Sequence, residues 1–169
     1  FQQCLLDSEK ALNARKYLGE RKLAGDTVRK FGLGYAPESW DWLVQQAANS
    51  GKSAELLETV GLIAKRTEGK SGYYDRFRDR VMFPIRDMQG RTVGFGGRIL
   101  PSSAAAERGP KYYNSSETPL FSKSDQLSGI DLARQPAPKA GYPAIGAGYT
   151  HARVGPPPGR RPVLPTVAP

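Results

Sequence analysis

The first third of the chain carries hydrophobic residues at the three- and four-residue spacing of one helix face. Ser8 and Asp26 each precede such a run, in the position where a side-chain oxygen caps the free N–H groups of a helix. Two further runs begin at Ser39 and near Ser53, and each is followed by a glycine of the kind that ends helices. Residues 8–62 are therefore predicted to be mainly helical, with their apolar stripes packed in a core.

From Tyr73 onward the hydrophobic residues alternate with polar ones, as they do in a β-strand. Residues 76–86 place apolar side chains at the odd positions: Phe77, Val81, Phe83 and Ile85. The even positions carry guanidinium groups, which we call the arginine row: Arg76, Arg78, Arg80 and Arg86. Because Pro84 lacks the N–H that a sheet needs, this strand is predicted to lie at an edge or to contain a bulge.

A hairpin is predicted to join this strand to a second one. Its loop spans residues 87–90 and ends on a glycine, which suits the positive φ of a tight turn. The second strand, 91–100, contains three glycines, which weaken a strand unless another group must approach its backbone closely. Nine of the 14 prolines fall in residues 128–169. The predicted fold class is α+β, with N-terminal helices, a small antiparallel sheet and a disordered proline-rich C-terminal tail.

Composition narrows the functions that this fold could serve. The 169 residues carry a formal net charge of +9, so polyanions are the leading class of partner. A single cysteine, Cys4, excludes a disulfide framework and a cysteine-based zinc site, and the one histidine, His151, lies in the proline-rich tail. No stretch approaches the roughly 20 apolar residues of a membrane span, so no membrane partner is expected and a cytoplasmic location is the default.

The arginines are the candidate functional residues. Between Arg76 and Arg98 there are six arginines and no lysine, and a guanidinium fits phosphate oxygens two at a time and stacks on bases. The alternative is an ordinary solvated face, on which nearby carboxylates would pair with the arginines: Asp75, Asp79 and Asp87. The glycines before Arg98 indicate either a bulge or the close approach of a phosphate. Lys111, Tyr112 and Asn114 form either a plain turn or a site for a single nucleic-acid strand.

A series of short motifs runs through the chain in a fixed order. They are Phe31–Pro37 with Trp40, Tyr74–Ile85, Gly90–Arg91, Gly94–Arg98, Pro110–Tyr112, Asn114–Ser115 and Glu117–Phe121. Together they closely resemble the bacterial replicative DNA primases of the DnaG type. The likeness covers roughly residues 8–135, and a set of motifs in family order is far more specific than any one of them.

The resemblance implies an RNA polymerase that starts short RNA primers on single-stranded DNA in the bacterial cytoplasm, at the nucleoid, together with the replicative helicase. It implies that residues 1–127 are the N-terminal subdomain of the catalytic core, whose basic surface binds template, primer and ribonucleoside triphosphates. Carried over by position, the nucleic-acid-binding residues are Arg76, Arg78, Arg80, Arg98, Lys111, Tyr112 and Asn114. In the family, a following Toprim subdomain holds Mg²⁺ or Mn²⁺, and Zn²⁺ belongs to an N-terminal module missing here.

The sequence departs from the family where the Toprim subdomain would begin. Residues 128–169 are expected to be a degraded start of that subdomain, disordered from about residue 143. Ala147 stands where the resemblance places the catalytic glutamate, and His151 where it places an aspartate. Neither supplies the hard oxygen ligand that magnesium prefers. The chain is therefore expected to be a primase fragment that binds single strands or an RNA–DNA hybrid weakly and makes no primers.

Two other classes of function stay open at this point. One is a non-catalytic module that binds single-stranded nucleic acid and has lost its metal site. An acidic continuation in another reading frame of the encoding DNA would argue against it. The other is a structural adaptor between proteins, which would need the arginines to be engaged in salt bridges.

Overall fold

The structure is a computed structural model that describes residues 1–67, 71–107 and 109–122. Its helices are α1 (Gln2–Asp7), the 3₁₀ turn η1 (Glu9–Ala11), α2 (Leu12–Glu20), α3 (Gly25–Phe31), α4 (Trp42–Asn49) and α5 (Ala54–Thr59). Its strands are β1 (Gly34–Ala36), β2 (Ile63–Lys65), β3 (Tyr73–Asp75), β4 (Arg80–Arg86), β5 (Thr92–Ile99) and β6 (Tyr112–Asn114). The predicted proline-rich tail and the predicted second domain, 128–169, lie outside the described residues. Among the described helices, none has the length and apolar character needed to cross a membrane.

A four-stranded antiparallel sheet, in the order β1-β4-β5-β6, forms the centre of the fold. β4 and β5 are the long central pair, and β1 and β6 add three residues each at the two edges. β2 and β3 form a separate two-stranded sheet. The α+β class is confirmed, although helices and strands are interleaved along the chain instead of following one another in two blocks.

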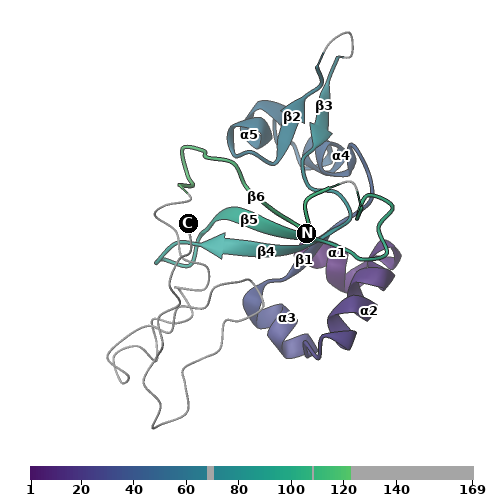
Figure 1. The fold of residues 1–169 in the computed structure, drawn as a ribbon. Helices are drawn as coiled ribbons and strands as arrows, with labels where there is room; N and C mark the ends of the chain where they lie inside the picture. The colour runs from purple at the N-terminus through teal and green to yellow at the C-terminus, as the bar shows by residue number, and fades with distance from the viewer. Residues whose placement is uncertain (68–70, 108, 123–169) are drawn as a thin grey trace, which may run out of the picture.

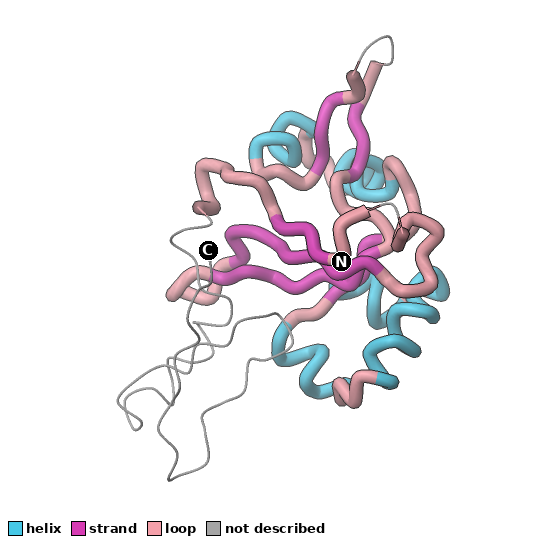
Figure 2. Tube along the Cα trace, viewed as in Figure 1, coloured by secondary structure: helices cyan, strands magenta, loops and turns pink. Residues whose placement is uncertain are grey.

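Each face of the four-stranded sheet is covered by a different part of the chain. In Figure 1, α1–α3 lie on one side of β4 and β5, and α4, α5 and the β2–β3 pair lie on the other. Figure 2 shows these two groups of helices on either side of the strands. Val81 and Phe83 belong to one buried cluster with Leu5 of α1, whereas Phe77 and Met82 belong to another. Both faces of β4 are therefore buried, which gives it an almost continuous apolar run.

Local sequence signals place several helix ends correctly. The Ser8 hydroxyl caps the 3₁₀ turn that leads into α2, and the Ser53 hydroxyl caps α5. Gly32 ends α3 in the left-handed conformation, with a φ of 67°. The prediction that Asp26 caps a helix is wrong, because α3 already begins at Gly25. Asp26 lies in the first turn, where its negative charge still suits the helix dipole.

The strand predicted over residues 76–86 is wrong in its first part. β3 ends at Asp75, residues 76–79 are not part of a strand, and β4 begins only at Arg80. Asp79 has a φ of 48°, in the left-handed region that residues other than glycine seldom adopt. A residue in this conformation interrupts the alternation of side chains between two faces. The arginine row is therefore divided between a bend and a strand and does not line one face.

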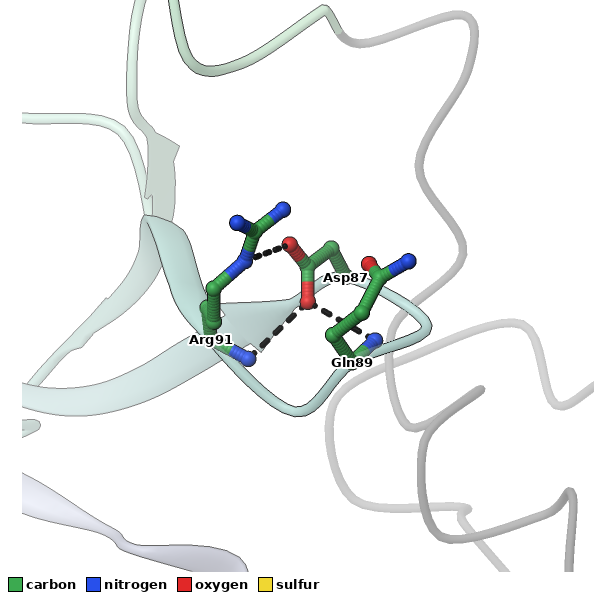
Figure 3. A network of polar contacts seen from close by, with 3 residues as sticks. All are labelled: Asp87, Gln89 and Arg91. Atoms are coloured by element: carbon green, nitrogen blue, oxygen red, sulfur yellow. Dashed lines mark hydrogen bonds and ion pairs between the residues drawn. The ribbon is translucent and has the colours of Figure 1, made fainter.

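The hairpin predicted between the two long strands is confirmed. Gly90 has a φ of 80°, as the turn requires. The Asp87 carboxylate accepts hydrogen bonds from the backbone N–H groups of Gln89 and Arg91, both at 2.9 Å (Figure 3). The Nε of Arg91 donates to the same carboxylate at 2.7 Å. These contacts fix the turn and, with it, the register of β4 against β5.

Pro84 has no N–H that it could donate to a neighbouring strand. The pairing of β1 with β4 stops at Met82, so Pro84 lies beyond the end of β1. β4 is an inner strand of the sheet, so the predicted edge position is wrong. A register shift follows between Ile85 and Arg86, but its extra residue, Val93, lies on β5 and not on β4. The sequence does not predict β1, β2 and β6, because strands of three residues show too little alternation to be recognised.

Candidate nucleic-acid interface

Three members of the arginine row lie against aromatic rings. The Cζ of Arg78 is 3.9 Å from the centre of the Trp40 ring and 5.7 Å from that of Tyr74. The Cζ atoms of Arg76 and Arg80 are 5.8 and 5.6 Å from the Tyr113 ring. At these distances the cation is attracted to the face of the ring. We name this group the arginine–aromatic cluster, which consists of Arg76, Arg78, Arg80, Trp40, Tyr74 and Tyr113.

Neutral acceptors hold the two half-buried arginines of the cluster in place. Arg76 donates from Nε and Nη2 to the Tyr113 hydroxyl at 3.1 and 2.5 Å, and from Nη1 to the Ser116 hydroxyl at 2.8 Å. Arg78 donates from Nη1 to the backbone carbonyl of Asp75. None of these acceptors carries a negative charge, so the contacts fix both side chains without neutralising them.

Arg80 is the buried member of the cluster, with 7% of its surface exposed. Its guanidinium bridges two backbone carbonyls, donating to Gly97 O at 3.2 Å and to Pro110 O at 3.0 Å. A Cβ at Gly97 would lie 3.0 Å from the Cδ of Arg80 and 3.0 Å from the Cδ1 of Phe77. A similar Cβ at Gly94 would lie 3.1 Å from the Phe121 ring. Side chains of the protein itself thus account for these two glycines.

The aspartates next to the cluster do not pair with its arginines. Asp75 caps a helix, Asp79 accepts a hydroxyl hydrogen bond at 2.7 Å, and Asp87 closes the hairpin. The hydroxyl is that of Tyr35, whose pKa is raised by burial and by its contact with Asp79. In the described ranges, no carboxylate lies within ion-pair distance of Arg76, Arg78 or Arg80. The hypothesis of a solvated face paired with these aspartates therefore fails for Arg76, Arg78 and Arg80, although Asp87 does pair with Arg91 at 2.7 Å. Among the described residues, the salt bridges that an adaptor would need are likewise missing at these three arginines.

The guanidinium groups keep their charge in this setting. Burial lowers the pKa of Arg78, and nearby Tyr74 and Asp75 oppose this shift. Burial also lowers the pKa of Arg80, and the charge of Arg78 adds to the effect. The ordinary pKa of arginine is so high that both remain protonated at neutral pH. The cluster is consequently a fixed, positively charged group of side chains beside three aromatic rings, of which Trp40 is exposed and Tyr74 and Tyr113 are half-buried.

Arg98 and Tyr112 lie on the opposite face of the sheet. They are register partners, and Arg98 also faces Val81, which is buried in the cluster that contains α1–α3 residues. Arg98 is only 5% exposed and donates to the hydroxyls of Tyr17 in α2 and of Tyr112, the latter at 2.7 Å. The Cζ of Arg21 lies 5.4 Å from the centre of the same Tyr17 ring. The basic and aromatic character therefore continues onto α2.

The predicted site residues thus form two groups at the β6 side of the sheet rather than one row. Lys111 and Asn114 are exposed on and beside β6, next to Tyr112. Sequence reasoning missed the aromatic partners of the arginines, which are Trp40, Tyr74, Tyr113 and Tyr17. It also missed Arg21, which lies over the Tyr17 ring. The four-residue spacing of Tyr17 and Arg21 on a predicted helix is a signal that could have paired those two.

The described residues do not fit the divalent metal that the resemblance implies. Within the described ranges, no group of three histidine, cysteine, aspartate or glutamate side chains is placed to hold a metal ion. Ala147 and His151, where the sequence departs from the family, lie outside those ranges. No step through a metal ion is therefore derived from these residues.

Comparison with known proteins gives a consistent result. A family model for the "DNA primase catalytic core, N-terminal domain" matches residues 1–134. The DNA primase of Escherichia coli is 41% identical over 135 residues, which are 80% of this chain and 22% of that protein. The chain therefore spans about a fifth of the length of this curated relative.

Two solved structures extend the comparison to the fold. One is the RNA polymerase domain of Mycobacterium tuberculosis primase DnaG, in complex with a double-stranded DNA oligomer with a 6-nucleotide overhang. It is 40% identical with a TM-score of 0.73, and the match covers 83% of this chain and 42% of that one. The other is a DnaG primase catalytic domain bound to single-stranded DNA. It is 40% identical with a TM-score of 0.67, and the match covers 80% of this chain and 39% of that one. Sequence and fold thus agree over most of the chain.

Proposed function

The chain belongs to the DnaG-type DNA primases, as part of the N-terminal domain of their catalytic core, and from that premise we propose that its arginine–aromatic cluster holds the phosphates of a single-stranded DNA template. The full-length protein would be a cytoplasmic RNA polymerase that makes short primers from ribonucleoside triphosphates beside the replicative helicase. The relatives solved with DNA support a nucleic-acid partner. The divalent metal for the chemistry would be held outside the described residues.

The observation that carries this proposal is that arginines of the cluster are held in place by neutral groups and keep their charge. Arg76 donates to two hydroxyls and Arg78 to a backbone carbonyl, and neither pairs with a carboxylate in the described ranges. A guanidinium that is already fixed loses less conformational entropy when it binds a phosphate. The two Nη atoms of Arg80 already donate to backbone carbonyls of the protein. We therefore assign phosphate contact to Arg76 and Arg78, and a supporting role to Arg80.

An exposed aromatic ring supplies the second component of a single-strand site. Trp40 is 58% exposed and lies against Arg78 of the cluster, whereas Tyr112, which is 47% exposed, lies against Arg98 on the opposite face of the sheet. Bases of any sequence can stack on such rings, with a gain of about 1–3 kcal/mol for each base. The site should therefore bind single strands with little preference for sequence.

The test is a salt titration of the Arg76→Ala/Arg78→Ala double variant with a fluorescein-labelled oligo(dT), read by fluorescence anisotropy. Each phosphate contact on a single strand contributes about −0.7 to the slope of log K against log salt, so losing two flattens the slope by about 1.4. Between ~50 and ~200 mM salt the affinity of the unaltered chain should then fall about sevenfold more than that of the variant.

A matched control removes two charges that are already neutralised. Lys65 pairs with Glu58 at 3.4 Å and Arg91 pairs with Asp87 at 2.7 Å. The Lys65→Ala/Arg91→Ala double variant should keep the slope of the unaltered chain. Equal slopes in the cluster variant and the unaltered chain would show that the cluster does not contact phosphates.

A further inference from the structure

Asp75 caps α4 from a distant part of the chain. Its carboxylate accepts from the backbone N–H of Leu43 at 2.6 Å and from that of Val44 at 3.2 Å. Asp41, at the N-cap position of this helix, makes no capping hydrogen bond with its side chain. The helix predicted from Ser39 accordingly begins only at Trp42. The first free N–H groups of α4 are thus bonded by a β3 residue that is 3% exposed.

The backbone of Asp75 holds both members of the closest cation–π pair in the cluster. Its N–H donates to the carbonyl oxygen of Trp40 at 2.8 Å. Its own carbonyl oxygen accepts from Nη1 of Arg78. The guanidinium of Arg78 in turn lies 3.9 Å from the centre of the Trp40 ring. A single residue therefore connects the backbone of Trp40, the guanidinium of Arg78 and the start of α4.

We propose that Asp75 is a positioning residue that fixes Trp40 and Arg78 as one platform on which a nucleic-acid base stacks. The inference rests on the proposed function. Trp40 lies between β1 and α4, outside any helix or strand, and is more than half exposed. Ordering a free side chain at the moment of binding lowers affinity, so a platform ordered in advance binds more tightly. The carboxylate points to helix N–H groups rather than to Arg78, and this leaves the guanidinium charge available to the ligand.

The experiment reads the platform directly by fluorescence. The chain has two tryptophans, so a Trp42→Phe background leaves Trp40 as the only tryptophan whose emission is followed. In that background, oligo(dT) is titrated into the unaltered chain, Asp75→Asn and Asp87→Asn, and both quenching of Trp40 and Kd are recorded. Asparagine has one accepting oxygen where aspartate has two, and its NH₂ group cannot accept. One of the two N–H groups, that of Leu43 or that of Val44, therefore loses its acceptor. Asp87 is the matched control, because its carboxylate also accepts two backbone N–H groups but lies in the β4–β5 turn.

The expected result is a selective loss at Asp75. Asp75→Asn should raise Kd about tenfold, equivalent to about 1.4 kcal/mol, and should reduce the quenching of Trp40. Asp87→Asn should leave both unchanged. A Trp40→Ala variant, read by anisotropy, completes a double-mutant cycle, in which Asp75→Asn should weaken binding no further once Trp40 is removed.

Three results would overturn the inference while leaving the proposed function intact, provided that the unaltered chain binds. They are an Asp75→Asn variant with unchanged quenching and Kd, effects of Asp75→Asn and Trp40→Ala that simply add, and an Asp75→Asn variant that is unfolded by circular dichroism. In the last case Asp75 would support the whole fold and not the platform. Failure of the unaltered chain to bind oligo(dT) with salt dependence would overturn both proposals.

Discussion

Replacing Arg80 by lysine separates a structural arginine from one that contacts the ligand. The guanidinium of Arg80 is buried and donates to Gly97 O at 3.2 Å and to Pro110 O at 3.0 Å. An ammonium keeps the charge but is a single point and cannot bridge both carbonyls. One of the two charge-assisted hydrogen bonds is then lost, which costs about 1–3 kcal/mol. Arg80→Lys should therefore lower the free energy of unfolding by about that amount.

Urea denaturation followed by circular dichroism measures this loss. With an m-value of about 2 kcal/mol/M, the midpoint should fall by about 0.5–1.5 M. Arg91→Lys is the control, because the Arg91 side chain is 75% exposed and a lysine can still pair with Asp87, so the change should be below about 0.5 kcal/mol. The salt slope of oligo(dT) binding should be the same for Arg80→Lys as for the unaltered chain. An unchanged urea midpoint combined with weaker DNA binding would refute the structural assignment and make Arg80 a phosphate contact.

Two further predictions concern the sheet and its hairpin. Gly97→Ala should destabilise the fold by about 1–3 kcal/mol, because the new Cβ would lie 3.0 Å from Phe77. Gly19 lies in α2, and its Cβ would have nothing within 4 Å, so Gly19→Ala should stabilise the fold by up to about 1 kcal/mol. Thermal melts of both variants measure the two effects. Partial desolvation would raise the pKa of Asp87, but hydrogen bonds from Arg91 and Gln89 outweigh it and hold that pKa below its ordinary value. The ionised Asp87 carboxylate therefore stabilises the fold above its unfolded pKa of about 3.9, and this stabilisation is lost as the pH falls through its folded pKa. Asp87→Asn should accordingly make stability fall less steeply between about pH 5 and pH 2 in acid denaturation curves.

The parts of the fold that the sequence predicts well are those determined by neighbouring residues. Ser8 and Ser53 cap helical segments because a hydroxyl needs only the N–H groups two or three positions ahead of it. Gly90 and Asp87 make the hairpin turn for the same local reason. The cap of α4 could not be predicted in this way, because Asp75 lies 32 positions after Leu43, whose N–H donates to its carboxylate.

The candidate site was predicted in its residue types but not in its arrangement. Alternation within residues 76–86 indicates one strand, but residues 76–79 form a bend in which Asp79 has a left-handed backbone. That conformation is held by tertiary contacts, since the Asp79 carboxylate accepts from Tyr35 and its N–H donates to Pro37 O. Sequence alternation carries no record of such contacts. For the same reason it could not show that Arg98 faces Tyr17 on the other side of the sheet.

The division of the arginines explains why arginine, and not lysine, occupies these positions. Arg80 and Arg98 are 7% and 5% exposed and bridge acceptors on separate segments, which requires a planar group with several fixed donors. Arg76 and Arg78 are half-buried and rest on aromatic faces, where a delocalised and weakly hydrated cation is held without a counter-ion. A lysine would lose one of the two hydrogen bonds at Arg80 and at Arg98, and it would be poorly fixed at Arg76 and Arg78. The same residue type therefore serves stability at Arg80 and Arg98 and the proposed phosphate binding at Arg76 and Arg78, and substitutions by lysine should separate the two roles.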